Sequence, residues 1–225
     1  MQFDRKARIV ADLIRSHLGR APSKVLVVGC GTGREAAQLA QSWGADVTGI
    51  DLAPRFDTKA ANVATLLPGD ATALEFPDGH FDFIYSYHAL EHIPDFRRAL
   101  REMQRVLAKQ GAYCIGTPNR RRLIGYLGSD NASLRDKFAW NFVDWKARLR
   151  GRFRNEFGAH AGFTRTELRH ELTQGLGPAV DITSSYYLKL YSRKRTYVRM
   201  LEQMKLSEWL FPAVYFVGQR AAGLT

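Results

Sequence analysis

In the first 118 positions, short β-branched runs alternate with sets of apolar residues at helical spacing. Residues 9–18 repeat apolar positions about every 3.6 residues up to Gly19, which predicts an amphipathic opening helix. The run VLVV at 25–28 predicts a strand buried on both faces, and Ala-rich helical sequence follows at 34–43. Further strands are predicted at 47–50, 63–67, 81–85 and 112–116.

Strands that alternate with helices predict a doubly wound α/β domain, with a mostly parallel sheet covered on both faces. A connecting helix is predicted at 95–109, and Gly111 is placed to terminate it. Two more strands are predicted in the second half, at 179–188 and 211–217, with a helix near 196–204 between them. The sheet is therefore expected to have seven strands.

We predict one domain over residues 1–225, with three regions inside it. Residues 1–119 hold the alternating strands and helices, and residues 178–225 hold the last two strands. Residues 120–177 are basic and rich in aromatic side chains, and they read as helical and irregular. We expect this region to be a helical cap, inserted after the fifth strand, over a ligand crevice.

Ligands of open parallel sheets bind beyond the carboxyl ends of the strands. Four positions fall at such ends: the turn 29–33, Asp51, Asp70 and the pair 86–87. The turn reads Gly-Cys-Gly-Thr-Gly, which lets a ligand approach the backbone and directs helix N-terminal amides toward it. The NAD fingerprint Gly-x-Gly-x-x-Gly fails at Arg34, and no Walker A sequence follows. A purely structural turn remains the alternative.

Two acidic residues add to this signal. Asp51 can accept hydrogen bonds from both ribose hydroxyls of an adenosine group, or it can cap the next helix. Asp70 can accept from an adenine amino group, while the Ala71 amide meets a ring nitrogen. Each residue has a structural alternative, but all three features at strand ends favour an adenosyl ligand.

The first half resembles the class I S-adenosylmethionine-dependent methyltransferases, most closely the type-11 group that includes the quinone-biosynthesis methyltransferases. The resemblance covers about residues 20–120, with a fainter match at 160–168. It rests on the runs VLVVGCGTGREAAQLA, VTGID, LPGDATALEFPDGHFDFIYSYHALEHIPD and GAYCIGTPN.

The resemblance implies a Rossmann-like methyltransferase fold whose last strand is antiparallel, with residues 1–119 as the cofactor-binding half. This sequence departs from the family pattern between Asp51 and Asp70. The span is short and contains Pro54 and Pro68, which predicts an abbreviated second helix and third strand. The contacts implied for S-adenosylmethionine are Gly29, Gly31 and Gly33 around the methionine part, Asp51 on the ribose, Leu52 on the adenine face, Asp70 and Ala71 at the adenine edge, and Ser86 and Tyr87 on the methionine side.

The run His88-Ala-Leu-Glu-His92 matches a His-x-x-Glu-His zinc pattern, but it follows a buried parallel strand rather than lying in a helical scaffold. We therefore predict no metal. Methyl transfer to a hydroxyl requires removal of its proton, and a neutral histidine is the natural base. His88 and His160 are the candidate bases, and a structural role remains open for both.

Positive charge is concentrated in the second half. The net charge is +11; residues 1–118 hold 14 Lys and Arg against 13 Asp and Glu, and residues 119–225 hold 19 against 9. An anionic partner is therefore expected there, although a solvated basic surface fits equally well. We favour a small-molecule or lipid-like acceptor, which can be acidic, with peripheral contact to anionic membrane. Nucleic acid ranks lower, because no RNA-binding appendage is recognisable.

No apolar run approaches the roughly 20 residues of a membrane-spanning helix, and the N-terminus lacks a secretory pattern, which predicts a cytoplasmic protein. Cys30 and Cys114 form no CxxC pair, and we expect both to be reduced and buried. The leading prediction is a methyltransferase that converts S-adenosylmethionine to S-adenosylhomocysteine. An RNA methyltransferase and a non-catalytic S-adenosylmethionine-binding relative are the alternatives.

Overall fold

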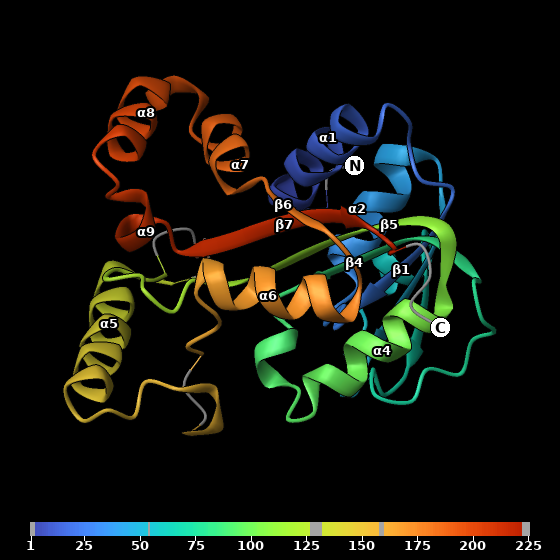
Figure 1. Ribbon diagram of the computed structural model, residues 1–225, viewed down its shortest axis with the longest axis horizontal. Helices are drawn as coiled ribbons and strands as arrows, with labels where there is room; N and C mark the ends of the chain where they lie inside the picture. The colour runs from blue at the N-terminus through green and yellow to red at the C-terminus, as the bar shows by residue number, and fades with distance from the viewer. Residues whose placement is uncertain (1–2, 54, 127–131, 158–159, 222–225) are drawn as a thin grey trace.

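The computed structural model describes residues 3–53, 55–126, 132–157 and 160–221. Its centre is a seven-stranded sheet in the order β3-β2-β1-β4-β5-β7-β6 (Figure 1). The first five strands are parallel, and β7 is antiparallel to both β5 and β6, which confirms the predicted sheet and its antiparallel last strand. The strands are β1 Lys24–Val28, β2 Asp46–Asp51, β3 Thr65–Pro68, β4 Phe81–Tyr87, β5 Leu107–Pro118, β6 Ala179–Asp181 and β7 Ala213–Gln219.

Helices cover both faces of this sheet, and β1 illustrates why. Val25 and Val27 pack into a cluster with α1 and α2, while Leu26 and Val28 pack into a second cluster with α4 on the opposite face. All four side chains are buried, each contributing roughly 1.5–3 kcal/mol of transfer free energy. The helices are α1 Arg5–Leu18, α2 Arg34–Trp43, α3 Thr58–Ala61, α4 Phe96–Val106, α5 Leu134–Leu149, α6 Arg165–Gly175, α7 Thr183–Leu190, α8 Arg195–Gln203 and α9 Ser207–Leu210.

The predicted end of the helix at 95–109 is wrong. The helix α4 ends at Val106, and β5 begins at the next residue, Leu107. Leu107 pairs with Phe81 of β4 and is fully buried, so its side chain belongs to the sheet rather than to a further helical turn. Gly111 lies inside the strand, where a Cβ would come 2.6 Å from the Leu107 Cδ1.

The strand predicted at 179–188 is also wrong beyond its first residues. Only Ala179–Asp181 pairs with β7, and α7 follows at Thr183–Leu190. The Asp181 Oδ1 accepts a hydrogen bond from the Thr183 amide at 2.8 Å, which satisfies one of the unpaired donors at the start of the helix. The buried tyrosines Tyr186 and Tyr187 then lie on the side of α7 that faces the sheet.

The abbreviated segment between β2 and β4 is as predicted. The helix α3 and the strand β3 have four residues each. Pro68 is the last residue of β3, and Pro54 lies outside the described residues. Cys30 and Cys114 are free and buried, as expected. Among the described residues, no helix is long and apolar enough to cross a membrane.

Candidate active site

A glycine turn joins the end of β1 to the start of α2. Gly29, Gly31 and Gly33 have φ angles of 73°, 54° and 80°, a region that residues with a side chain rarely adopt. A Cβ on Gly29 would lie 2.2 Å from the Ala89 Cβ, whereas a Cβ on Gly31 would meet no atom within 4 Å. Close packing therefore requires glycine at position 29, while Gly31 lies at an open edge where a ligand can approach the backbone.

Asp51, the last residue of β2, is hydrogen-bonded to this turn. Its Oδ2 accepts from the Gly31 amide at 2.8 Å, and its Oδ1 accepts from the Ala53 amide at 3.0 Å. These bonds hold the carboxylate at the edge of the sheet beside Leu52, whose side chain is 78% exposed. Leu52 therefore presents apolar surface where a flat ring can pack.

Asp70 follows β3 and forms a local turn with Thr72. Its Oδ1 accepts hydrogen bonds from the amide and the hydroxyl of Thr72, both at 2.8 Å. These bonds, and more weakly the positive charge of Arg98, hold the pKa of Asp70 below its ordinary value. The carboxylate is therefore ionised at neutral pH and can accept a hydrogen bond from a ligand.

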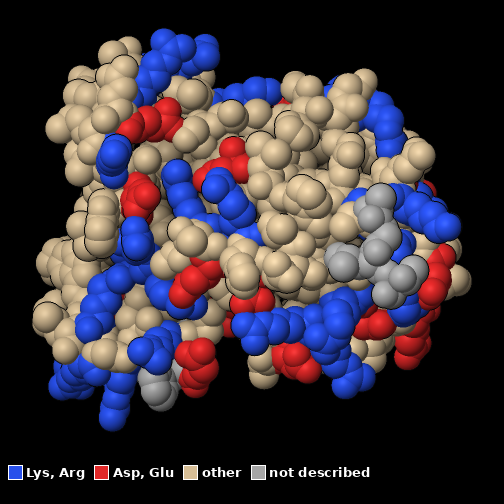
Figure 2. All heavy atoms as spheres, in the orientation of Figure 1, with Lys and Arg blue, Asp and Glu red and all other residues tan. Residues whose placement is uncertain are grey.

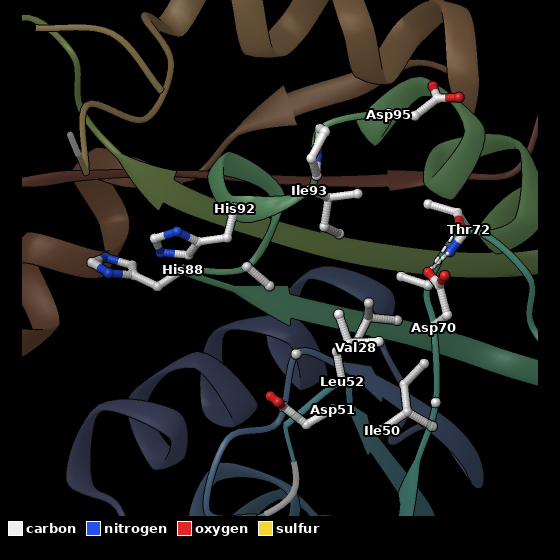
Figure 3. Close-up of a pocket in the computed structure, with 15 residues that line it drawn as sticks. Val28, Ile50, Asp51, Leu52, Asp70, Thr72, His88, His92, Ile93 and Asp95 are labelled. Carbon is white, nitrogen blue, oxygen red and sulfur yellow. Dashed lines mark hydrogen bonds between the residues drawn. The ribbon is translucent and has the colours of Figure 1, made fainter. Parts of the chain in front are cut away.

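These side chains converge on one cavity of 560 Å³ at the carboxyl ends of β1 to β4 (Figure 3). That volume lies in the range of small-molecule sites, roughly 300–1,000 Å³. In Figure 3, Asp51 and Asp70 project from the ends of two different strands. The predicted residues that line this cavity are Gly29, Asp51, Leu52, Asp70 and Ala71.

Four other predicted contacts do not line this cavity. Gly31 borders open space, and a Cβ on Gly33 would lie 2.2 Å from a Leu66 methyl carbon. Ser86 is fully buried, and its hydroxyl donates to a main-chain carbonyl oxygen of β1, so the expectation that it lines the crevice is wrong. The Tyr87 ring stacks on Tyr215 and lines a second cavity instead.

A histidine cluster surrounds a buried carboxyl group just after β4. The Glu91 Oε1 lies 4.0 Å from the His88 Nδ1 and 3.8 Å from the His92 Nε2. The His92 Nε2 in turn lies 3.1 Å from the Nδ1 of His160, which is 68 positions away in the chain. Figure 3 shows the His88 and His92 rings pointing in the same direction, away from Asp70. The fold thus brings both candidate bases into one cluster.

Burial dominates the electrostatics of this cluster. The Glu91 side chain is fully buried, and neither carboxyl oxygen has a hydrogen-bond partner among the described residues. Burial raises the pKa of Glu91 to about 7. The pKa of His88 is lowered, first by the protein packed around a side chain that is still 45% exposed, and further by the positive charge of Arg122 and by His160. His88 is therefore neutral at physiological pH.

A second cavity, of 420 Å³, shares His88 with the first. The segment after β5 contributes Arg122 to its lining, and His160 and Lys6 also lie there. Much of the rest of its lining is aromatic. Five tyrosines line this cavity: Tyr87, Tyr126, Tyr186, Tyr187 and Tyr191. Within the described residues, the region predicted as a cap contributes to this cavity and not to the first.

The tyrosines of α7 were missed because their segment reads as a strand by composition. The spacing of Thr183, Tyr186, Tyr187, Leu190 and Tyr191 is i, i+3, i+4, i+7, i+8, which is the pattern of an amphipathic helix. This helical period is the sequence signal that could have identified α7. The described residues contain no group of three or more His, Cys, Asp or Glu side chains arranged to hold an ion.

Comparison with known proteins finds sequence similarity in the first half of the chain. Residues 26–115 match the family model described as Methyltransferase domain. The 2-methyl-6-phytyl-1,4-hydroquinone methyltransferase of Synechocystis sp. is 37% identical over 103 residues, which are 43% of this chain and 32% of that protein. The demethylmenaquinone methyltransferase of Thermus thermophilus is 37% identical over 106 residues, 44% of this chain and 48% of that protein. The similarity thus spans a third to a half of these relatives.

Solved structures extend the similarity of fold to nearly the whole chain. The 1,6-didemethyltoxoflavin-N1-methyltransferase of Burkholderia thailandensis has a TM-score of 0.58 at 18% identity, over 96% of this chain and 79% of that one. The [4+2]-cyclase SpnF has a TM-score of 0.59 at 17% identity, over 96% of this chain and 81% of that one. One of these structures carries a methyltransferase name and the other a cyclase name, so the fold alone does not specify the reaction.

Proposed function

We propose that this chain, whose residues 26–115 match the methyltransferase-domain family model, transfers a methyl group from S-adenosylmethionine to a small-molecule acceptor. One observation carries the proposal: Gly29 of the glycine turn, Asp51 and Asp70 come from separate parts of the sequence and meet at one cavity. The matched family and the names of the relatives support the same reaction.

The first cavity fits the cofactor in shape and polarity. The open edge at Gly31 admits a ligand next to the backbone, and Asp51 is placed to accept from ribose hydroxyls. Leu52 offers an apolar surface for the adenine, whose amino group can donate to the ionised Asp70. When bound, S-adenosylmethionine supplies a methyl group that is already activated by its sulfonium, so the protein contributes mainly position.

The second cavity is the proposed acceptor site. Because His88 lines both cavities, groups bound in the two would meet at this residue. The tyrosine lining favours a planar ring, and Lys6 and Arg122 favour a hydroxyl that becomes negative as it loses its proton. The relatives act by name on hydroquinone, tocopherol and menaquinone compounds, which supports a lipid-like phenolic acceptor.

Between the two candidate bases, His160 is better suited. The lowered pKa of His88 makes its ring a weaker base than an ordinary histidine. The Nδ1 of His160 contacts His92, which leaves its Nε2 to accept the hydroxyl proton of the acceptor. In this proposal His88 orients the acceptor and His160 holds the proton while the new bond to the methyl carbon forms.

Isothermal titration calorimetry with S-adenosylmethionine and S-adenosylhomocysteine tests the cofactor site. We expect saturable binding that Asp51→Ala weakens by roughly tenfold or more, through loss of charge-assisted hydrogen bonds to the ribose. Asp46→Ala is the matched control, because Asp46 is an exposed residue at the opposite end of the same strand. No binding at millimolar S-adenosylmethionine, or binding of NAD instead, would overturn the proposal.

Turnover is tested separately, by release of S-adenosylhomocysteine from a panel of phenols and hydroquinones. His160→Gln is expected to lower kcat by about a hundredfold and leave the affinity for S-adenosylmethionine unchanged. Tight cofactor binding with no turnover on any acceptor would instead favour a non-catalytic relative. The positive charge of residues 119–225 further supports peripheral contact of the enzyme with anionic membrane.

A further inference from the structure

The helix α5, Leu134–Leu149, turns its polar side toward the protein. Its single buried residue is Asn141, whose side chain exchanges hydrogen bonds with the backbone of Gly125. On the same side, the Asp144 carboxylate pairs with the buried Arg122 at 3.2 Å, and Arg148 donates to two main-chain carbonyl oxygens. Hydrogen bonds and an ion pair therefore hold this side of the helix against the rest of the chain.

Four apolar side chains of α5 form a stripe that faces solvent. Leu134, Phe138, Phe142 and Leu149 are between 58% and 90% exposed. At about 100° per residue, these four positions fall within an arc of about 80° on the helix surface. Surface helices of globular proteins ordinarily bury such a stripe, so its outward direction calls for a ligand or partner.

Basic residues border this stripe on one side. Arg135 and Lys146 are exposed and follow it on the helix surface, and Arg150 continues the same edge. Figure 2 shows Lys and Arg side chains beside uncharged surface at the end of the molecule where Figure 1 places α5. An apolar stripe with a cationic border matches the interface of an anionic bilayer, where apolar side chains enter the acyl boundary and cations meet lipid phosphates.

A second helix at the same end of the molecule repeats this composition. Figure 1 shows α8 at the end that also carries α5 and α9. In and just after α8, Tyr197, Met200 and Met204 are exposed, and the helix positions place them on one side. Exposed cations, among them Arg195 and Arg199, lie in the same helix. Exposed apolar side chains beside positive charge, which suit an anionic surface, therefore occur on two helices at this end of the molecule.

We propose that α5 docks this protein on membranes that contain anionic phospholipid, with Leu134, Phe138, Phe142 and Leu149 inserted into the interface. A second protein molecule is a weaker candidate partner, because the positive charge of residues 119–225 opposes self-association through this end. This inference rests on the proposed function in one respect, because a lipid-like acceptor gives membrane docking a purpose. Membrane binding itself is measured without any methyl transfer.

The docking helix is connected to the proposed acceptor cavity. Arg122 and Tyr126 line that cavity, and both contact Asp144 of α5, at 3.2 and 3.5 Å. The Tyr126 ring also packs edge-on against Trp140. The helix that would rest on the bilayer with its stripe therefore contacts two residues of the proposed acceptor cavity with its other side.

Co-sedimentation with vesicles tests the proposal on the full 225-residue chain. One set of vesicles contains phosphatidylcholine alone, and the other contains equal parts of phosphatidylcholine and phosphatidylglycerol. We expect binding to the mixed vesicles that is roughly tenfold or more stronger than to phosphatidylcholine and that weakens with added salt. Phe142→Ser should reduce the partition coefficient by about tenfold or more, because a phenyl group no longer leaves water.

Val143→Ser is the matched control, since Val143 is the next residue, is 62% exposed, and lies about 100° further round the helix, away from the stripe. It should leave vesicle binding within about twofold of the native chain. If Phe142→Ser fails to fold, Leu149→Ser at the end of the helix replaces it. Equal effects of the two substitutions, or binding that ignores lipid charge, would overturn the proposal. So would a dimer, seen by sedimentation velocity without vesicles, that Phe142→Ser dissociates. Calorimetry of each variant with S-adenosylmethionine separates failure of docking from failure of the cofactor site.

Discussion

Replacing Glu91 with glutamine is expected to change how stability depends on pH. The side chain is fully buried, and its two oxygens have no hydrogen-bond partner among the described residues. The groups that face it are the rings of His88 and His92, at 4.0 and 3.8 Å, and the charge of Arg122. Glutamine keeps the size of the side chain and removes its ionisation, so the comparison isolates the cost of the buried charge.

The magnitude follows from the pKa of Glu91, which burial raises from 4.5 to about 7. A carboxyl whose pKa is higher in the folded state stabilises the fold fully below its unfolded pKa and loses that contribution as the pH rises through the folded pKa. The loss corresponds to about 3 kcal/mol between the two limits. Glu91→Gln should therefore be more stable than the native chain above about pH 8, and the gain should vanish near pH 4.

Urea denaturation followed by circular dichroism, at a series of pH values, measures this difference. The lowered pKa of His88 makes its own contribution, which is lost as the pH falls through the unfolded histidine value. Both chains share that contribution, so it cancels to first order in the difference between them. Parallel stability curves for Glu91→Gln and the native chain between about pH 5 and pH 8 would refute a buried carboxyl that titrates near 7.

Four further substitutions separate packing from ligand contact. Gly29→Ala should lose about 2–3 kcal/mol in thermal unfolding, because its Cβ would lie 2.2 Å from a neighbouring Cβ, while Gly31→Ala should lose only about 1 kcal/mol but weaken S-adenosylmethionine binding in calorimetry. Ser86→Ala should cost about 1 kcal/mol of unfolding free energy and leave cofactor affinity unchanged, since its hydroxyl is buried in the sheet. Tyr187→Phe should cost about 2 kcal/mol, measured by urea denaturation, because the buried Ala213 amide that donates to its hydroxyl at 3.0 Å would lose its acceptor; an unchanged unfolding midpoint would contradict this bond.

The central strands could be predicted because short continuous runs of apolar residues indicate burial on both faces. The run at 25–28 is apolar at every position, as a strand covered on both faces must be, and it forms most of β1. The ends of strands depend on pairing with strands that are distant in the sequence. The strand β4 continues two residues past its predicted end because Ser86 and Tyr87 still pair with neighbouring strands. Ser86 is therefore part of the sheet, and its predicted place in the crevice fails for this reason.

The histidine cluster could not be predicted as a unit. His88, Glu91 and His92 are close in sequence, and their spacing identified them as a group. The contact of His92 with His160 depends on how the chain returns from the region after β5. The isolated bridge between Asn119 and Phe163 fixes this return, and the Phe163 amide donates to the Pro118 carbonyl oxygen. Such a contact depends on the tertiary path, which no short-range pattern specifies.

The helix α5 shows what a hydrophobic pattern leaves undetermined. A stripe at positions 134, 138, 142 and 149 indicates that a helix has an apolar side, and the ordinary inference is that this side faces the core. Here the core side is occupied by Asn141, Asp144 and Arg148, which satisfy backbone groups of the segment after β5. The polar bonds favour this orientation because the groups that they satisfy would otherwise be left without partners inside the protein. Periodicity therefore predicts that the stripe exists, while the hydrogen bonds of the opposite side decide that it faces outward, toward the membrane in our proposal.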